Sequence, residues 1–354
     1  MASTLTTEFG HLQIPLEDVQ HATNNFSDKN VIGKGGFGKV YKGNLKTASG
    51  ESMKIAARRL DRRRGQGDFE FWTEVSVLSS LKHKNIVTLI GFCDENGEKI
   101  IIHRHYGKGS LNMHLNNTNL TSLQRLEIAE GIADAINYLH RLPGESYHVI
   151  HRNINSSTIL LNNKWQPKLS GFEFSIKHQK DRINQIYITK PIGTPGYIDP
   201  DTHKIGGVTY KSDVYSMGVV FFEILCGRKA YDPDAHDDNK FLVQLARSHC
   251  KNKTLRDIII HHDHLWNLWN GQYNYDVCDY LSTQAYHCTT EAEADRIDTY
   301  NVWGLLHTIV NLIKYPNAST ESGDALRDSV DDNARGSFKP TKVPFYIIKR
   351  GKGK

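Results

Sequence analysis

The sequence predicts an α+β fold of two lobes, in which a small sheet-rich lobe precedes a larger helical lobe. Short β-type runs separated by turn residues occupy much of residues 31–103. From residue 110 onward, apolar residues recur every three or four positions, as they do on amphipathic helices. Residues 212–226 are apolar on nearly every side of a helix, which predicts that this helix is buried.

Changes in composition divide the chain into four parts. Residues 1–15 are largely polar and unpatterned, so we expect a flexible leader. The sheet-rich lobe is expected over residues 16–105 and the helical lobe over residues 106–314. Residues 315–354 are rich in Asn, Ser, Asp and Gly and end in a short basic stretch, which predicts a flexible tail.

The elements of the sheet-rich lobe follow from local periodicity. Helical spacing over residues 16–23 leads into the first strand-like run. A second helix is predicted over residues 69–81, because Phe71, Val75 and Leu78 lie near one of its faces. The strand-like runs are Val31–Ile32, Lys39–Tyr41, Lys54–Ala56, Val87–Phe92 and Ile100–His103.

Two helices of the second lobe carry end signals. Thr121 and Gln124 have the spacing of a capping box, in which a hydroxyl and an amide satisfy the free backbone groups at a helix start. Ile128, Ile132 and Ile136 continue this helix at helical spacing. Gly227 predicts the end of the buried helix over 212–226.

The composition limits the class of protein. With 354 residues, 38% hydrophobic and 23% charged, the chain looks like an ordinary soluble globular protein. Its net charge of +5 is too small to indicate a nucleic-acid partner. Five cysteines without CxxC spacing favour a reducing compartment. No secretory signal is visible, and no apolar run approaches the roughly 20 residues needed to span a bilayer. We therefore expect a cytoplasmic protein without direct membrane insertion.

A glycine-rich loop lies between the first two strand-like runs. It reads Gly-x-Gly-x-x-Gly-x-Val, with the glycines at Gly33, Gly35 and Gly38 and the valine at Val40. Glycines allow the backbone to approach phosphate groups closely. Dinucleotide-binding folds share part of this pattern, but there the loop joins a strand to a helix. A loop between two strands favours the protein-kinase type of phosphate loop.

The ordered set of motifs resembles the plant receptor-like cytoplasmic serine/threonine protein kinase family. The resemblance runs from Leu16 to about Lys314 and implies the bilobal protein-kinase fold. Its motifs besides the glycine loop are Asn24–Phe26, His83–Val87, Gly91–Cys93, His151–Arg152, Gly193–Tyr197 and Asp213–Ser216.

The resemblance also implies an ATP site. The family's strand lysine falls on Arg58, which keeps the charge but replaces a compact ammonium with a planar fork. Its helix partner falls on Glu74, so an Arg58–Glu74 ion pair is expected. His103 replaces the usual residue at the start of the hinge, which changes the expected adenine pocket. The positions that match residues sandwiching adenine are Val40, Ala56 and Leu160.

The family's catalytic positions are replaced. The catalytic aspartate falls on Asn153, whose amide cannot accept a proton near neutral pH. The catalytic lysine falls on Asn155, the metal-binding asparagine on Thr158 and the magnesium aspartate on Gly171. If each stabilising group contributes about 3 kcal/mol, even partial additivity removes many orders of magnitude in rate. The chain therefore resembles a pseudokinase with weak ATP binding at most and without magnesium, unless Glu173 turns toward a metal.

Positions with structural or regulatory roles in the family are retained. Arg152 matches the arginine that binds a phosphate on the activation segment. Asp201 and Arg296 fall on an ion pair that stabilises the large lobe. Leu78, Leu89, His151 and Phe172 match the regulatory hydrophobic stack, which Asp213 anchors. The candidate phosphorylation sites are Tyr187, Thr189, Thr194 and Tyr197.

These features predict a catalytically impaired protein that acts as a scaffold, decoy or allosteric partner in receptor-kinase signalling. Its expected partners are active receptor-like kinases or immune receptors, which would also recruit it to the plasma membrane. One alternative is an active serine/threonine kinase that uses Arg58 and Glu173 in unusual roles. Two others are a nucleotide sensor that binds ATP without metal and a degenerating duplicate without a role.

Overall fold

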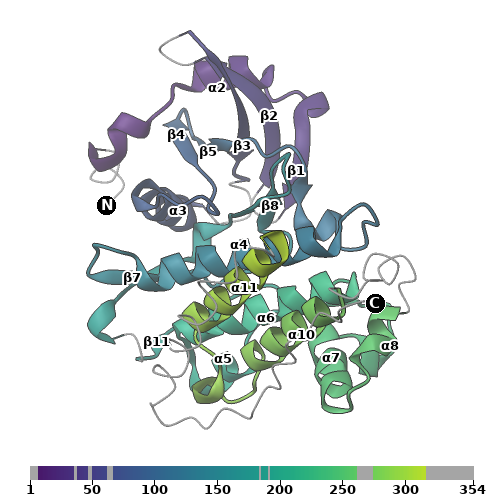
Figure 1. Ribbon diagram of the computed structural model, residues 1–354. Coiled ribbons are helices and arrows are strands. Elements are labelled where there is room, and N and C mark those ends of the chain that lie inside the picture. The colour runs from purple at the N-terminus through teal and green to yellow at the C-terminus, as the bar shows by residue number, and fades with distance from the viewer. Residues whose placement is uncertain are drawn as a thin grey trace. The chain divides into compact units, whose positions relative to one another are not determined.

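The computed structural model describes residues 7–35, 38–46, 50–61, 67–182, 185–189, 192–260 and 274–315. The chain divides into two compact units, residues 1–307 and residues 308–354. The first unit holds the predicted sheet-rich lobe and the predicted helical lobe up to residue 307, and Figure 1 labels their strands and helices. The described part of the second unit is the end of helix α11 (Thr299–Lys314) and Tyr315, so the rest of the predicted tail lies outside the described residues.

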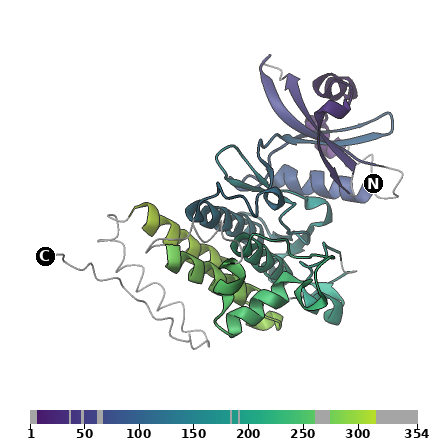
Figure 2. The ribbon, with the colours of Figure 1, turned by 90° about the vertical axis from the view of Figure 1, so that its right-hand side faces the viewer.

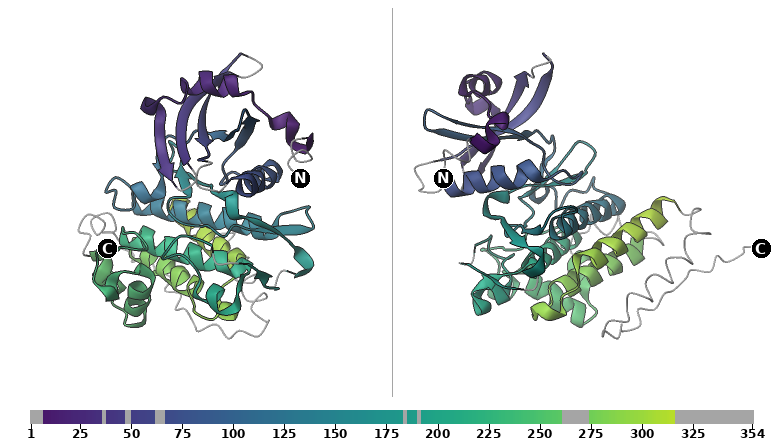
Figure 3. Two further views of the ribbon diagram at one scale, coloured as in Figure 1. Left: turned by 180° about the vertical axis from the view of Figure 1, so that it is seen from behind. Right: turned by 90° about the vertical axis from the view of Figure 1, so that its left-hand side faces the viewer.

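The small lobe is a five-stranded antiparallel sheet with the strand order β1-β2-β3-β5-β4. Helices α2 (Leu16–Thr23) and α3 (Asp68–Ser80) pack on opposite faces of this sheet (Figures 2 and 3). The predicted α+β class and the sheet-first order are therefore confirmed. The strands are β1 (Val31–Gly35), β2 (Gly38–Lys46), β3 (Ser52–Arg59), β4 (Leu89–Glu95) and β5 (Glu98–Arg104).

Strand register places the predicted ATP-site residues of the sheet on one face. Val40 pairs with Arg58 across β2 and β3, and Ala56 pairs with His103 across β3 and β5. Because side chains alternate between the faces of a strand, Ala56 and Arg58 point to the same side. That side carries α3, whereas Ile55 and Ala57 point toward α2.

The segment before α2 is packed rather than loose. Residues 7–15 were expected to be flexible, but Phe9 is only 7% exposed and packs in a cluster with Trp72 and Phe92. The backbone N–H of Ile14 donates to the carbonyl of Phe92 at 2.8 Å. A few apolar side chains in a polar stretch are enough to attach the segment to α3 and β4. Residues 1–6 lie outside the described part.

The large lobe is built around helices that pack on α6 (Tyr210–Cys226), which is buried along most of its length as predicted. The capping box at Thr121 is present, since Gln124 and Thr121 exchange hydrogen bonds of 3.0 and 3.1 Å at the start of α4 (Ser122–Arg141). The other helices are α5 (Pro200–Ile205), α7 (Leu242–Lys251), α8 (Leu255–Ile260) and α10 (Asn274–Cys288).

Short ribbons of the large lobe carry the functional loops. One sheet joins β6 (Gly109–Ser110), β8 (Ile159–Leu161) and β9 (Pro167–Leu169). The 3-10 turn η5 (Phe172–Phe174) follows β9. The remaining pairs are β7 (Tyr147–Ile150) with β10 (Ile176–Gln179), and β11 (Tyr187–Ile188) with β12 (Gly207–Val208).

A buried carboxyl group on α6 joins two of these loops. Oε1 of Glu223 accepts hydrogen bonds from the hydroxyls of Tyr197 (2.6 Å) and Ser156 (3.1 Å) and from the backbone N–H of Ala230 (3.0 Å). Burial raises the pKa of Glu223 to about 7, although these hydrogen bonds oppose the shift. Burial also raises the pKa of Tyr197.

The packing of the N-terminal segment can be tested with two phenylalanines of opposite exposure. Phe9→Ala is expected to lower the free energy of unfolding by about 3 kcal/mol, because it leaves a cavity against Trp72 and Phe92. Phe69, at the start of α3, is 78% exposed and serves as the matched control. Phe69→Ala is expected to change stability by less than about 0.5 kcal/mol. Urea unfolding measures both, and equal effects would contradict the packed segment.

The raised pKa of Glu223 predicts a pH-dependent stability. The folded chain binds this proton more tightly than the unfolded chain between pH 4.5 and about 7, so the stabilisation is complete below that range and is lost as the pH rises through it. From about pH 5.5 to pH 8, the wild-type chain is expected to lose about 2 kcal/mol more than Glu223→Gln. Denaturant unfolding at both pH values measures this difference. The same pH slope in both proteins would refute the assignment.

Candidate active site

Predicted residues from both lobes meet at Arg58, near the end of β3. Its Nη2 forms an ion pair with Glu74 of α3, which confirms the predicted pair. Its Nη1 lies 3.2 Å from Oε2 of Glu173 in η5. Glu74 is also contacted by His103 of β5, whose Nε2 lies 3.2 Å from Oε1. Arg58 therefore links β3, α3 and η5.

Glu173 does not turn toward a metal position. The residue is 3% exposed, and its carboxylate lies between Arg58 and Asn153. Nδ2 of Asn153 donates to Oε1 of Glu173 at 3.2 Å. The possibility that Glu173 serves as a replacement metal ligand is thus not supported, because Arg58 and Asn153 contact both of its oxygens.

The cluster at Arg58 has an excess of negative charge. Burial, together with the charge of Arg58, lowers the pKa of His103 to about 3, so its imidazole is neutral near pH 7. The remaining charged side chains are one guanidinium, Arg58, and two carboxylates, Glu74 and Glu173. A further anion that approaches Arg58 therefore meets two carboxylates already in place.

Asn153 and Asn155, at two of the family's catalytic positions, form an uncharged hydrogen-bonded set with the candidate phosphorylation site Thr194. Nδ2 of Asn155 donates to Oδ1 of Asn153 at 3.1 Å and to Oγ1 of Thr194 at 3.2 Å. The hydroxyl of Thr194 donates to the same Oδ1 of Asn153 at 3.2 Å. Sequence reasoning treated these three positions separately and missed that they are partners. Amides and a hydroxyl in this arrangement provide neither a base nor a cation.

The kinase resemblance implies a magnesium ion, but the residues at its expected positions do not fit one. Magnesium prefers oxygen ligands and commonly takes carboxylates. The hydroxyl of Thr158 donates to the backbone carbonyls of Asn153 and Asn155, each at 3.0 Å. Gly171 has no side chain, and a Cβ built there would lie 2.7 Å from Cγ2 of Thr158. Within the described residues, no cluster of three or more His, Cys, Asp or Glu side chains could hold a metal.

Two members of the predicted regulatory stack, His151 and Phe172, are in contact, and Asp213 binds the backbone next to them. The rings of His151 and Phe172 lie 4.6 Å apart between centroids, and Leu78 is buried, while Leu89 is half-buried in the neighbouring cluster. Asp213 of α6 accepts the backbone N–H of His151 at 2.7 Å. Burial raises the pKa of Asp213, but hydrogen bonds from His140 and His151 outweigh it, so the pKa lies below its usual value.

The four candidate phosphorylation sites differ in accessibility. Tyr187 is 41% exposed, and Oγ1 of Thr189 accepts a 3.0 Å hydrogen bond from Nη2 of Arg152. The hydroxyl of Thr194 belongs to the uncharged set described above. Tyr197 is 8% exposed and bonded to Glu223, so its selection as a phosphate acceptor is not supported. Tyr187 and Thr189 remain candidates.

The predicted ion pair of the large lobe has a different main partner. Nη1 and Nη2 of Arg296 bind the two carboxylate oxygens of Asp199 at 2.5 and 2.7 Å. Asp201, the predicted partner, also forms an ion pair with Arg296, at 3.7 Å from Nη2, and accepts the backbone N–H of Glu293 as well. Sequence matching alone could not distinguish two carboxylates that are two positions apart.

The glycine loop approaches β3 closely. Gly38 has φ = 115°, and a Cβ built there would lie 2.0 Å from the carbonyl oxygen of Arg59. Gly33 has room, since its Cβ would meet Val40 at 3.6 Å. Gly35 ends β1, and Gly36 and Phe37 lie outside the described residues. Leu160, the third predicted adenine contact, lies half-buried on β8.

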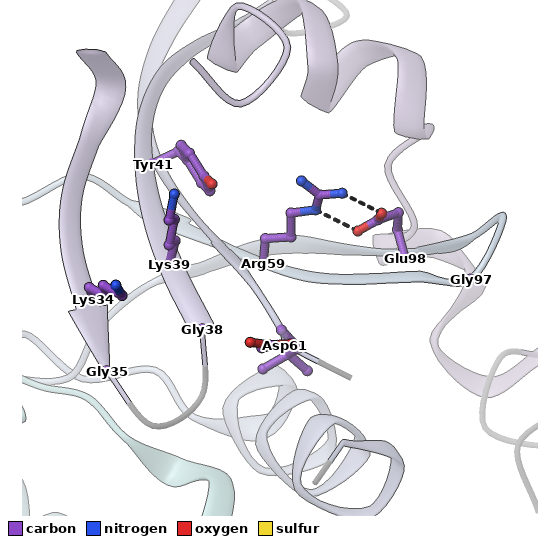
Figure 4. A pocket seen from close by; sticks show the side chains of 10 residues that line it. Lys34, Gly35, Gly38, Lys39, Tyr41, Arg59, Asp61, Gly97 and Glu98 are labelled. Atoms are coloured by element: carbon purple, nitrogen blue, oxygen red, sulfur yellow. Dashed lines mark hydrogen bonds and ion pairs between the residues drawn. The ribbon is translucent and has the colours of Figure 1, made fainter. Parts of the chain in front are cut away.

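An open pocket of about 540 Å³ lies beside this loop but is not the predicted ATP site. Its lining includes Lys39, Tyr41 and Arg59, which point away from the face of Val40 and Arg58 because side chains alternate along a strand. Figure 4 shows Arg59 bound to Glu98 through two contacts, which measure 2.6 and 2.7 Å. The pocket is thus partly occupied by its own ion pair.

Within the described ranges, no helix has both the length and the hydropathy needed to cross a membrane.

The chain matches the family model "Protein tyrosine and serine/threonine kinase" over residues 26–267. It is 37% identical to the receptor-like protein kinase ANXUR2 of Arabidopsis thaliana over 327 residues, which are 91% of this chain and 36% of that relative. It is 38% identical to the receptor-like protein kinase FERONIA of the same plant over 247 residues, 69% of this chain and 27% of that relative. The chain therefore spans only about a third of the length of these relatives. With its kinase fold and this family match, the chain belongs to the protein tyrosine and serine/threonine kinase family and is similar to plant receptor-like protein kinases.

Proposed function

We propose that this chain is a pseudokinase, which acts as a scaffold, decoy or allosteric partner in receptor-kinase signalling. The observation that carries the proposal is the uncharged set in which Asn153 and Asn155, at two of the catalytic positions, hydrogen-bond to each other and to Thr194. A phosphoryl transfer needs a proton acceptor and cations around the transferred group. None of these three side chains supplies either.

The neighbours of Asn153 and Gly171 fit these residues better than they would fit the family's aspartates. An aspartate at position 153 would place a carboxylate beside Glu173, where Asn153 now donates a 3.2 Å hydrogen bond. An aspartate at position 171 would meet the methyl group of Thr158 at 2.7 Å and would need a backbone φ of 84°, which side chains other than glycine rarely adopt. Mutual adjustment of this kind supports a retained role over decay without one, and it disfavours an active kinase with unusual residues.

On this proposal, the chain keeps the structural contacts of a kinase fold but lacks the groups that catalyse phosphoryl transfer. The Arg58–Glu74 pair holds α3 against β3, and Asp213 holds the segment of His151. A surface of this shape can bind the partners that bind active relatives. We therefore propose active receptor-like kinases or immune receptors as partners, in the cytoplasm, with recruitment to the plasma membrane through them. ATP binding is proposed to be weak at most, without magnesium.

Phosphorylation by an active kinase is the proposed input. Thr189 lies next to Arg152, and a phosphate on its hydroxyl would gain a charge-assisted bond to the guanidinium. Such a bond would fix the segment that carries Tyr187 and Thr189 relative to the body of the large lobe.

The proposal predicts no phosphoryl transfer by the purified chain. With labelled ATP and magnesium or manganese, incorporation into the chain or a generic substrate is expected to equal that of Gly33→Ser. This control keeps the fold, because Gly33 has room for a Cβ, but it obstructs the phosphate loop. Asn153→Asp together with Gly171→Asp is expected to restore no activity. Incorporation by the wild-type chain that Gly33→Ser abolishes would overturn the pseudokinase assignment.

The proposed input predicts where a partner adds phosphate. The catalytic domain of an active receptor-like kinase is expected to phosphorylate this chain at Thr189 or Tyr187. The double variant Thr189→Ala with Tyr187→Phe should lose most of the incorporation, whereas Tyr197→Phe should keep it, because Tyr197 is buried. Phosphopeptide mass spectrometry on folded protein identifies the site. Phosphate mainly on Tyr197 would contradict the prediction that a partner kinase modifies Tyr187 or Thr189.

A further inference from the structure

The guanidinium of Arg58 is engaged by two carboxylates at once. Nη2 binds Glu74 and Nη1 lies 3.2 Å from Glu173, while the Arg58 side chain is only 15% exposed. The N–H groups of such a planar fork match the oxygens of both carboxylates and phosphates. The position that a phosphate oxygen would take on Nη1 is therefore occupied by Glu173.

The backbone holds Glu173 in this place. Gly171 has φ = 84°, a left-handed conformation that glycine adopts without strain, and it directs the chain into η5. Phe172, the first residue of η5, is fully buried and packs on His151. Glu173 follows with 3% exposure, so its carboxylate cannot turn into solvent without a change in η5. The glycine that removes a metal ligand is also the residue that positions this carboxylate.

Displacing Glu173 would be unfavourable. A phosphate that takes Nη1 leaves a buried carboxylate with only the Nδ2 of Asn153 at 3.2 Å. His103 cannot help, because burial and the charge of Arg58 keep it neutral near pH 7. Glu74 adds a second negative charge next to the same guanidinium.

We infer that Glu173 is an internal anion that occupies Arg58 in place of a nucleotide phosphate, so that the chain joins its two lobes without nucleotide. This inference rests on the proposed pseudokinase function and specifies how its site is regulated. The carboxylate of Glu173 connects η5 to Arg58 of β3 and, through Arg58, to α3. Phosphate compounds are excluded because Glu173 already occupies their position on Arg58, and not because a cation is absent. The chain thus blocks the site with its own side chain. A metal-free polyphosphate is the class of ligand that the site would bind if Glu173 were removed.

Removal of one charge tests the inference. Glu173→Gln keeps the shape of the side chain but weakens its hold on Arg58, so metal-free ATP is expected to bind this variant about 10- to 100-fold more tightly than the wild-type chain. Calorimetric titration with ATP and with inorganic tripolyphosphate, both in EDTA, measures the affinity. If the variant gains affinity for tripolyphosphate as well as for ATP, the effect arises at the phosphate position and not at the adenine position.

Two matched variants show whether the gain arises at Arg58. Glu98→Gln removes the same charge from the neighbouring Arg59–Glu98 pair on the other face of the sheet and is expected to leave ATP affinity unchanged. Adding Arg58→Met to Glu173→Gln is expected to abolish the gain. Equal affinities of the wild-type chain and Glu173→Gln, or an equal gain in Glu98→Gln, would overturn the inference.

A second measurement applies if Glu173→Gln does not fold. In the wild-type chain, the NMR signals of the Arg58 guanidinium, assigned with Arg58→Met, are expected to stay unchanged when ATP is added in EDTA up to about 1 mM. A shift of these signals would show that phosphate reaches Arg58 and would refute the internal anion. That result would leave the pseudokinase proposal intact, since only phosphoryl transfer contradicts the latter.

Discussion

The buried helix α6 is the constraint on which the functional loops of the large lobe depend. Asp213 near its start accepts the backbone of His151, and Glu223 near its end accepts the hydroxyl of Tyr197. Ten residues of helix separate the two carboxyl groups, a rise of about 15 Å along a rigid axis. The helix therefore sets the spacing of the two loops, and the chemistry of those loops can change without moving them. This explains how a kinase fold persists here with altered catalytic residues.

Arg58 fixes the relative positions of elements around the small lobe, as α6 fixes the positions of two loops in the large lobe. Its guanidinium is the common partner of a strand, a helix and the turn η5, through Glu74 and Glu173. A buried ion pair contributes little net stability compared with apolar packing, but removing one of its partners leaves an uncompensated buried charge. We therefore expect the cluster of Arg58, Glu74 and Glu173 to define the position of α3 more than it increases the free energy of unfolding.

Local signals in the sequence predicted the elements well, and long-range partners poorly. Periodicity placed a helix at 69–81 where α3 spans Asp68–Ser80, and the capping box at Thr121 was present as predicted. The resemblance also predicted the Arg58–Glu74 pair. It did not predict that Glu173 binds Arg58, 115 residues away, because that contact depends on how the fold brings β3 and η5 together. Phe9 was missed because one buried aromatic in a polar stretch leaves no periodic pattern.

The small space between Gly171 and the Thr158 methyl group has a consequence for how such a chain can evolve. Each replacement now fits the other: a side chain at 171 meets the Thr158 methyl group, and a carboxylate at 153 meets Glu173. A change to aspartate at either position, 153 or 171, therefore introduces a like charge or a steric overlap that the present structure does not contain. Under the proposed pseudokinase function, the route back to catalysis is thus obstructed at two places, and selection would act on the surface of the chain rather than on the chemistry of this site.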